Sequence, residues 1–162
     1  MTTAKRLEGK KILLVDDEPD ILETLEDLLS ECETVRASSF EEARAALERA
    51  PFDIAVLDIM GVNGFDLLEI AAGRNIISVM LTAHALSPES IKRSVSGGAD
   101  YYLPKEEMIN IAAHLNDILD DRAKGISPWT RWMHRLGGFC ESRFGPDWQK
   151  GDQIFWDKFP FH

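Results

Sequence analysis

The 162-residue chain has few cysteines and no long apolar run. Its two cysteines, Cys32 and Cys140, are far apart in the sequence, so no disulfide framework is indicated. No stretch approaches the roughly 18 consecutive apolar residues that a membrane span requires. The opening segment, MTTAKRLEGKK, lacks the apolar region of a signal peptide. We therefore expect a cytoplasmic protein that makes no membrane contact.

Basic residues are also scarce over most of the chain. Residues 1–123 contain 12 Lys and Arg against 24 Asp and Glu, whereas residues 124–162 contain 6 against 4. An acidic body argues against an electrostatic hold on nucleic acid, which needs a basic face, so we expect no direct DNA binding. Nine of the fourteen aromatic residues, including all four Trp, follow position 123. This change in composition predicts one domain over residues 10–123 and an aromatic, helical extension over residues 124–162.

Strand-like and helical segments alternate five times along the first part of the chain. The strand-like runs cover residues 10–15, 33–37, 52–58, 76–82 and 100–103, and each is followed by a helical pattern. The last of these helices is predicted over 105–122. Such alternation is typical of an α/β fold, with a parallel sheet covered by helices on both faces. Right-handed crossovers favour the flavodoxin-like strand order 2-1-3-4-5 and a three-layer sandwich.

Polar residues lie at the end of four of these runs or just beyond it, where each strand should end. They are Asp16, Asp17, Asp58, Thr82 and Lys105. In open parallel sheets, sites form outside the carboxyl ends of the strands, so these side chains should converge on one edge. Clustered carboxylates repel one another, and Mg²⁺, which prefers oxygen ligands, would relieve this repulsion. A neutralised carboxylate can then attack a phosphoryl group, while a hydroxyl and an ammonium group bind its oxygens.

Each of these residues has a plainer interpretation when it is taken alone. Asp58 could be a solvated strand end, and the acidic segment 16–18 could simply favour the dipole of the following helix. A Thr at a strand end is usually structural, and an isolated Lys is usually solvated. The occurrence of all of these residues, in this order, at the ends of four strands favours a phosphoryl-transfer site.

At these positions the sequence resembles the receiver domain of two-component response regulators, over about residues 10–122. The likeness rests on LLVDDEPD, AVLDIM, LTAHA and GGADYYLPK, and on their order and spacing. It implies that Asp58 is the phosphoacceptor. It also implies that Asp17, Asp58 and the backbone carbonyl of Met60 hold Mg²⁺, with Asp16 acting through a water molecule.

The same resemblance implies roles for four further side chains. Thr82 would be the switch hydroxyl, Lys105 would bind the phosphoryl group, and Tyr102 would be the aromatic residue that changes rotamer. Met60 and His84 would tune the rate of dephosphorylation. A histidine kinase or a histidine phosphotransfer protein would donate the phosphoryl group, and output would pass through protein–protein contacts rather than through an enzyme activity.

The sequence departs from the family pattern in two places. Gly64 follows the acceptor at six positions rather than about eight, so the loop after Asp58 is predicted to be short. No proline follows Lys105, which makes a cis peptide there improbable. The short loop leaves open a phosphorylation-independent pseudo-receiver that acts only in docking. A phosphatase of the haloacid-dehalogenase type is a more distant alternative, because the acidic residues after the first strand lack the required spacing and no cap domain is present.

The extension has an apolar face of its own. Trp129, Trp132, Met133, Leu136 and Cys140 fall on one side of a helix predicted over about 128–140. Trp148 and Trp156 follow in a second short segment. These aromatic residues pack on the receiver, lie in a partly ordered lid, or anchor a partner, and the partner could be a second copy in a homodimer. The predicted anchor set is Trp129, Trp132, Trp148 and Trp156, and the sequence does not identify the downstream partner.

Overall fold

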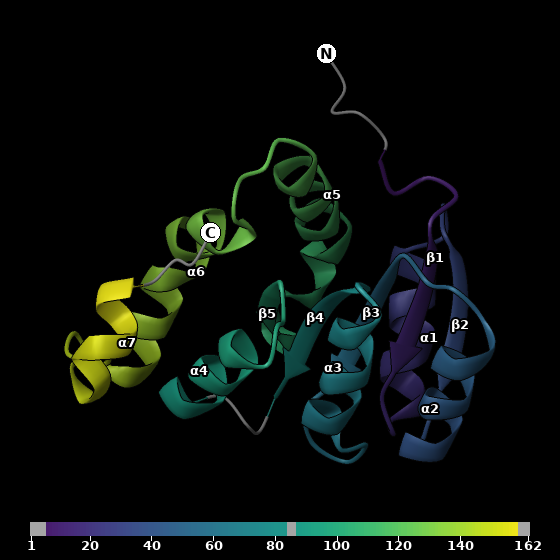
Figure 1. Ribbon diagram of the computed structural model, residues 1–162, viewed down its shortest axis with the longest axis horizontal. Coiled ribbons are helices and arrows are strands. Elements are labelled where there is room, and N and C mark those ends of the chain that lie inside the picture. Colours follow the sequence, from purple (N-terminus) through teal and green to yellow (C-terminus); the bar gives the residue numbers. More distant parts are fainter. Residues whose placement is uncertain (1–5, 84–86, 159–162) are drawn as a thin grey trace.

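A five-stranded parallel sheet forms the centre of the molecule (Figure 1). A computed structural model describes residues 6–83 and 87–158. The sheet has the order β2-β1-β3-β4-β5. The strands are β1 (Lys11–Val15), β2 (Glu33–Ala37), β3 (Ile54–Asp58), β4 (Ile77–Thr82) and β5 (Tyr101–Pro104). The predicted α/β class and flavodoxin-like order are therefore confirmed.

The composition of each strand matches its place in the sheet. Every residue of β3 and β4 is buried, as their continuous apolar runs require in the interior of a parallel sheet. Strand β2 lies at one edge, and its sequence ETVRA leaves only Ala37 fully buried. The register pairs Val56 of β3 with Leu14 on one side and with Val79 on the other. The strand ends are consequently aligned along one edge.

Helices follow the strands in strict alternation until β5. They are α1 (Pro19–Leu28), α2 (Phe40–Arg49), α3 (Gly64–Gly73), α4 (Pro88–Ser96) and α5 (Ile111–Ala123). Helix α1 begins at a proline, whose missing N–H has no partner to lose in a first turn. None of the helices in the described ranges is long and apolar enough to cross a lipid bilayer.

One predicted helix differs from the observed structure. The segment expected as a single helix over 105–122 begins as the 3-10 helix η1 (Lys105–Asn110), and only then continues as α5. Asn110 lies between the two with φ −99° and ψ 14°, outside the α-helical range, so the hydrogen-bond pattern restarts there. The 3-10 turn keeps Lys105 at the end of β5, beside the other strand ends.

The extension packs against the β5 side of the sheet. Helix α6 (Pro128–Phe144) contacts β5 and α5, and η2 (Lys150–Asp152) and α7 (Gln153–Lys158) follow it. In Figure 1 these elements lie at the end of the molecule opposite β2, next to α4. Lys92 of α4 pairs with Asp152 at 3.4 Å, which ties this second segment to the body.

Candidate functional site

The carboxyl ends of β1, β3 and β4 each bring one polar side chain to the same edge of the sheet. Asp16 follows β1 directly, Asp58 ends β3, and Thr82 ends β4. These residues are 0%, 4% and 1% exposed. The register pairs Asp58 with Leu81, which places Thr82 one residue beyond it. Three of the residues that the sequence predicted are thus brought together, and all of them are buried.

Lys105 lies among the carboxylates. Its Nζ is 3.0 Å from Asp16 Oδ2, 3.1 Å from Glu18 Oε1 and 3.6 Å from Asp58 Oδ1. Only 12% of this side chain is exposed, so solvent screens the contacts weakly. Glu18 was not among the predicted site residues, although its place in the acidic run after β1 was a signal that could have identified it.

The acidic side chains after β1 form a tight group. Asp16, Asp17 and Glu18 each offer an oxygen within 4.8 Å of the others. Asp16 Oδ1 accepts a hydrogen bond from the backbone N–H of Glu18 at 2.9 Å. Asp16 Oδ2 is buried and forms an ion pair with Lys105 Nζ at 3.0 Å, and it has no other hydrogen-bond partner among the described residues. This oxygen can therefore accept a further cation.

The electrostatics of the site reflect this crowding. Burial raises the pKa of Asp58 to about 7, the negative charge of Asp16 adds to the increase, and Lys105 opposes it. Burial also raises the pKa of Asp16, against the hydrogen bonds from Glu18 and Lys105. Burial alone would lower the pKa of Lys105, but its contacts with Asp16, Glu18 and Asp58 outweigh this effect and raise it. The site holds more negative charge than one ammonium group can neutralise.

The short loop after Asp58 forms one wall of a small pocket. The loop closes through a hydrogen bond from Gly64 N–H to Ile59 O at 3.2 Å. Gly61 has φ +84°, and Asn63 has φ +52°, so the chain turns through two left-handed residues. The pocket measures 210 Å³ and is lined by Asp17, Glu18, Asp58, Met60, Gly61, Ala83 and Lys105.

Two residues of this loop matter for the predicted site. The side chain of Met60 is 56% exposed, while its backbone carbonyl remains a predicted metal ligand. A Cβ at Gly61 would lie 2.5 Å from Asp17 Oδ2. The loop is two residues shorter than the family pattern, and its glycine lets the backbone lie close to the Asp17 carboxylate. The sequence-based prediction did not assign Gly61 a role.

Tyr102 lies with its hydroxyl between β5 and α4. The hydroxyl is 2.6 Å from Ser90 Oγ, and the residue is 0% exposed. Burial raises the pKa of Tyr102 to about 12, opposed by hydrogen bonding to Ser90, to the backbone of Ser87 and to Thr82. The predicted switch pair, Thr82 and Tyr102, is therefore in mutual reach. His84, the other predicted tuning residue, lies outside the described residues.

Comparison with known proteins identifies the family of this chain. A family model for the response regulator receiver domain matches residues 12–116. The chain belongs to the receiver-domain family. It is 35% identical over 153 residues to the response regulator protein PilR of Pseudomonas aeruginosa, covering 83% of this chain and 34% of that protein. It is 32% identical over 117 residues to the two-component response regulator ARR18 of Arabidopsis thaliana, covering 66% of this chain and 18% of that protein.

A solved structure supports the same assignment. The CheY-like receiver domain protein from Methanospirillum hungatei superposes with a TM-score of 0.64 at 28% identity, covering 72% of this chain and 98% of that one. The receiver chain described here spans only between about a fifth and a third of the length of the two curated relatives. The site residues lie within residues 12–116, the segment that the family model matches, whereas α6 and α7 lie beyond that segment.

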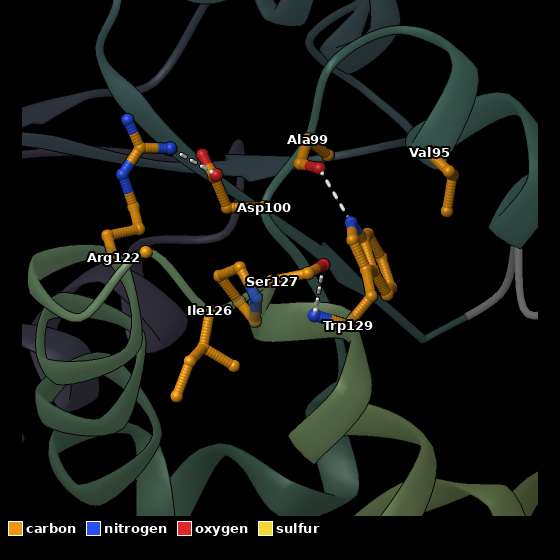
Figure 2. Close-up of a pocket in the computed structure, with 9 residues that line it drawn as sticks. Val95, Ala99, Asp100, Arg122, Ile126, Ser127 and Trp129 are labelled. Carbon is orange, nitrogen blue, oxygen red and sulfur yellow. Dashed lines mark hydrogen bonds and ion pairs between the residues drawn. The ribbon is translucent and has the colours of Figure 1, made fainter. Parts of the chain in front are cut away.

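Three of the four predicted anchor residues of the extension are buried in this receiver, and the fourth, Trp148, is half-buried. Trp129 is 5% exposed, and its indole N–H donates to Ala99 O at 3.0 Å (Figure 2). Trp132 is 0% exposed and donates to Tyr102 O at 2.7 Å. A partner could reach either indole only after α6 left β5. Their role as partner anchors stays a prediction that requires this separation.

The second segment extends the same aromatic packing. Trp148 and Trp156 meet edge to face with their ring centroids 4.9 Å apart, and Trp156 is 7% exposed. At the other end of α6, the turn from α5 borders a pocket of 360 Å³ in which Arg122 pairs with Asp100 at 2.6 Å (Figure 2). The four Trp residues therefore take part in packing within the chain.

Proposed function

We propose that this receiver is a phosphorylation-dependent signalling switch whose phosphoacceptor is Asp58. The observation that carries the proposal is the contact of a buried carboxylate at the end of β3 with Lys105, 3.6 Å away, at the mouth of a pocket with further carboxylates. The proposed donor is a histidine kinase or a histidine phosphotransfer protein. Output through protein contacts, the lack of a separate enzyme activity and a cytoplasmic location belong to the same proposal.

The residues of the pocket fit a divalent cation such as Mg²⁺. The carboxylates of the pocket and the Met60 backbone carbonyl offer oxygen ligands, which Mg²⁺ prefers, and the buried Asp16 Oδ2 has only Lys105 as a partner among the described residues. Asp17, Asp58 and the Met60 carbonyl would hold the cation, with Asp16 acting through water and Glu18 close by. When bound, the cation would supply positive charge against the carboxylates and the phosphoryl oxygens.

Three side chains of this protein, Asp58, Lys105 and Thr82, would carry out the phosphoryl transfer. The ionised Asp58 carboxylate forms the new O–P bond in line with the P–N bond of the donor histidine, which breaks. The electron pair of that bond stays on the imidazole, which then takes up a proton from solvent. Lys105 binds one phosphoryl oxygen as a flexible cation, and the Thr82 hydroxyl binds another. Positioning and charge are the main requirements of this chemistry.

Incubation with acetyl phosphate and Mg²⁺, followed by intact mass spectrometry, tests the proposal. We expect a gain of one phosphoryl group in the wild-type protein and no gain in Asp58→Asn. Asp66→Asn is the matched control, because Asp66 is an exposed aspartate in the adjacent helix and should leave the gain unchanged. Absence of any gain in the wild type, also with cognate kinases, would contradict the proposal and favour the pseudo-receiver alternative.

The close approach of Gly61 to Asp17 predicts a specific defect in cation binding. Gly61→Ala forces a Cβ to within 2.5 Å of Asp17 Oδ2 and displaces a proposed ligand. We expect Mg²⁺ affinity, measured by titration calorimetry, to fall roughly tenfold or more, as when groups that orient metal ligands are altered. Gly125→Ala is the control, because Gly125 shares a positive φ of +73° but has nothing within 4 Å. Equal affinity in the two variants would refute a role for Gly61.

Both curated relatives are much longer than this chain. Because this chain spans a minor part of PilR and of ARR18, the outputs of those proteins are not transferred to it. Homodimer formation and the absence of direct DNA binding are proposed on the basis of the sequence alone. The boundary between receiver and extension near residue 123, where α5 ends, is proposed on the same footing.

A further inference from the structure

Tyr102 is held both at its hydroxyl and at its backbone. On one side its hydroxyl contacts Ser90 Oγ of α4 at 2.6 Å and reaches Thr82. On the other side, the backbone carbonyl of the same residue accepts the indole N–H of Trp132 at 2.7 Å. Tyr102 and Trp132 are both 0% exposed. The tyrosine therefore occupies the buried, Thr82-facing position, and α6 covers the strand that carries it.

Helix α6 meets the receiver along its length. Near its start, Trp129 stacks on Tyr101 of β5 with ring centroids 6.4 Å apart. Further along the same face, Leu136 and Cys140 are each 2% exposed. Cys140 lies near enough to Tyr102 to affect its pKa. The face that α6 turns toward β5 is thus filled by buried side chains, and it contacts the backbone of Tyr102 through Trp132.

Charge complementarity holds α6 in one register. Arg131 pairs with Asp117 at 3.1 Å and with Asp121 at 2.7 Å, and Arg135 also pairs with Asp117. The acidic partners belong to α5, so a basic edge of α6 lies along an acidic edge of the receiver. The arginine side chains of these pairs are 37% exposed, whereas the aspartates are 17% and 3% exposed, and pairs of opposite charge fix the orientation of two surfaces.

We propose that docking of α6 and phosphorylation of Asp58 reinforce one another through Tyr102. The inference rests on the proposed function, in which the phosphoryl group draws Thr82 inward and Tyr102 follows. Because α6 stabilises the buried position of Tyr102, it favours the same state that phosphorylation favours. Linkage then requires that phosphorylation strengthens the docking of α6 by the same factor. Phosphorylation tightens the extension and does not release it.

This coupling predicts which surface a partner protein would use to distinguish the phosphorylated from the unphosphorylated state. Helix α6 of this chain packs on β5 and α5, and η2 of the extension pairs with α4. The occupant of the surface formed by β5 and α5 is thus a segment of the same molecule, matched to it by two indole hydrogen bonds and by opposite charge. A partner that distinguishes the two states would contact the outer side of α6 and α7.

Alkylation of Cys140 by N-ethylmaleimide measures the docking of α6 in the full chain. The thiol is 2% exposed, and burial raises its pKa to about 12, so it reacts only when α6 separates. We expect acetyl phosphate with Mg²⁺ to slow labelling of Cys140 about fivefold or more, the lower end of typical coupling between sites. Peptide mass spectrometry follows both thiols, and the half-buried Cys32 serves as the internal reference.

Three variants separate the possible outcomes. Asp58→Asn should show no effect of acetyl phosphate on labelling. The double variant Arg131→Glu, Arg135→Glu should label Cys140 faster, whereas Arg44→Glu, which removes an exposed pair on α2, should not. Unchanged or faster labelling of protein that has gained a phosphoryl group would overturn the coupling alone. Failure to gain a phosphoryl group would instead count against the proposed function.

Discussion

Asp58→Asn is expected to make the metal-free receiver more stable at pH 8. The unfolded chain loses this proton near the ordinary pKa of 3.8, whereas the folded chain retains it up to about pH 7. The folded state therefore binds more protons within this window, and its stability falls as pH rises through it. A shift of this size corresponds to about 4 kcal/mol.

The expected gain in the free energy of unfolding is somewhat smaller than the full cost of ionising Asp58 in the folded state. The amide gives up the attraction to Lys105, and the neighbouring Asp16 carboxyl adjusts its own protonation once Asp58 is neutral. We therefore expect Asn to raise the free energy of unfolding by roughly 2–4 kcal/mol above pH 7. The gain should shrink as the pH falls from 7 toward 4, because the unfolded carboxyl also becomes protonated as the pH approaches its ordinary pKa of 3.8.

Chemical denaturation with a chelator present, at a series of pH values from 5 to about 8, measures this difference. Asp66→Asn removes an exposed carboxylate from the same region and should show no comparable gain. Excess Mg²⁺ should reduce the difference, because a bound cation stabilises the wild-type carboxylates. A gain that is independent of pH would argue against a crowded, buried Asp58.

Gly64→Ala is expected to be the most damaging small substitution in the loop after Asp58. Its Cβ would lie 2.2 Å from Asp58 O and 2.8 Å from Ile59 Cα. Both are backbone atoms of β3 and of the loop, so no side chain can move aside to relieve the overlap. We expect a loss of about 3 kcal/mol in the free energy of unfolding, the upper part of the range for overpacked sites. Thermal and denaturant unfolding both report it.

Gly73→Ala is the matched control for this change. Gly73 belongs to the same helix, α3, and nothing lies within 4 Å of its would-be Cβ. Alanine is the better helix former by about 0.5–1 kcal/mol, so this variant should be as stable as the wild type or more so. Similar losses in both variants would show that the helix, rather than the contact with the end of β3, responds to the added methyl group.

The strand ends could be predicted from the sequence because each depends on a local pattern. A short apolar run that stops at a polar residue indicates where a buried strand ends, and parallel order then brings Asp16, Asp58 and Thr82 to one edge. The distribution of contacts could not be predicted in the same way. That Lys105 pairs with Glu18 as well as with Asp16 depends on where η1 begins, which is set by tertiary packing.

The loop after Asp58 and the C-terminal extension were likewise only partly predictable from the sequence. The position of Gly64 indicated a short loop, but the left-handed turns at Gly61 and Asn63 arise from the need to close that loop onto Asp17. Helical periodicity likewise predicted the apolar face that contains Trp129 and Trp132. Periodicity does not indicate what such a face covers, and both packing on the receiver and partner binding remained open from the sequence.

The two indole hydrogen bonds of α6 also bear on how the chain is made. Trp129 and Trp132 each lie 30 residues beyond the carbonyl that they bind. A growing polypeptide therefore completes β5, the last strand of the sheet order, well before its cover emerges from the ribosome. Exposed edge strands pair readily with other chains, and nascent domains are vulnerable in this way. Helix α6 thus packs on this strand only late in synthesis, and we expect chains that stop before the aromatic segment to aggregate more readily than the full chain.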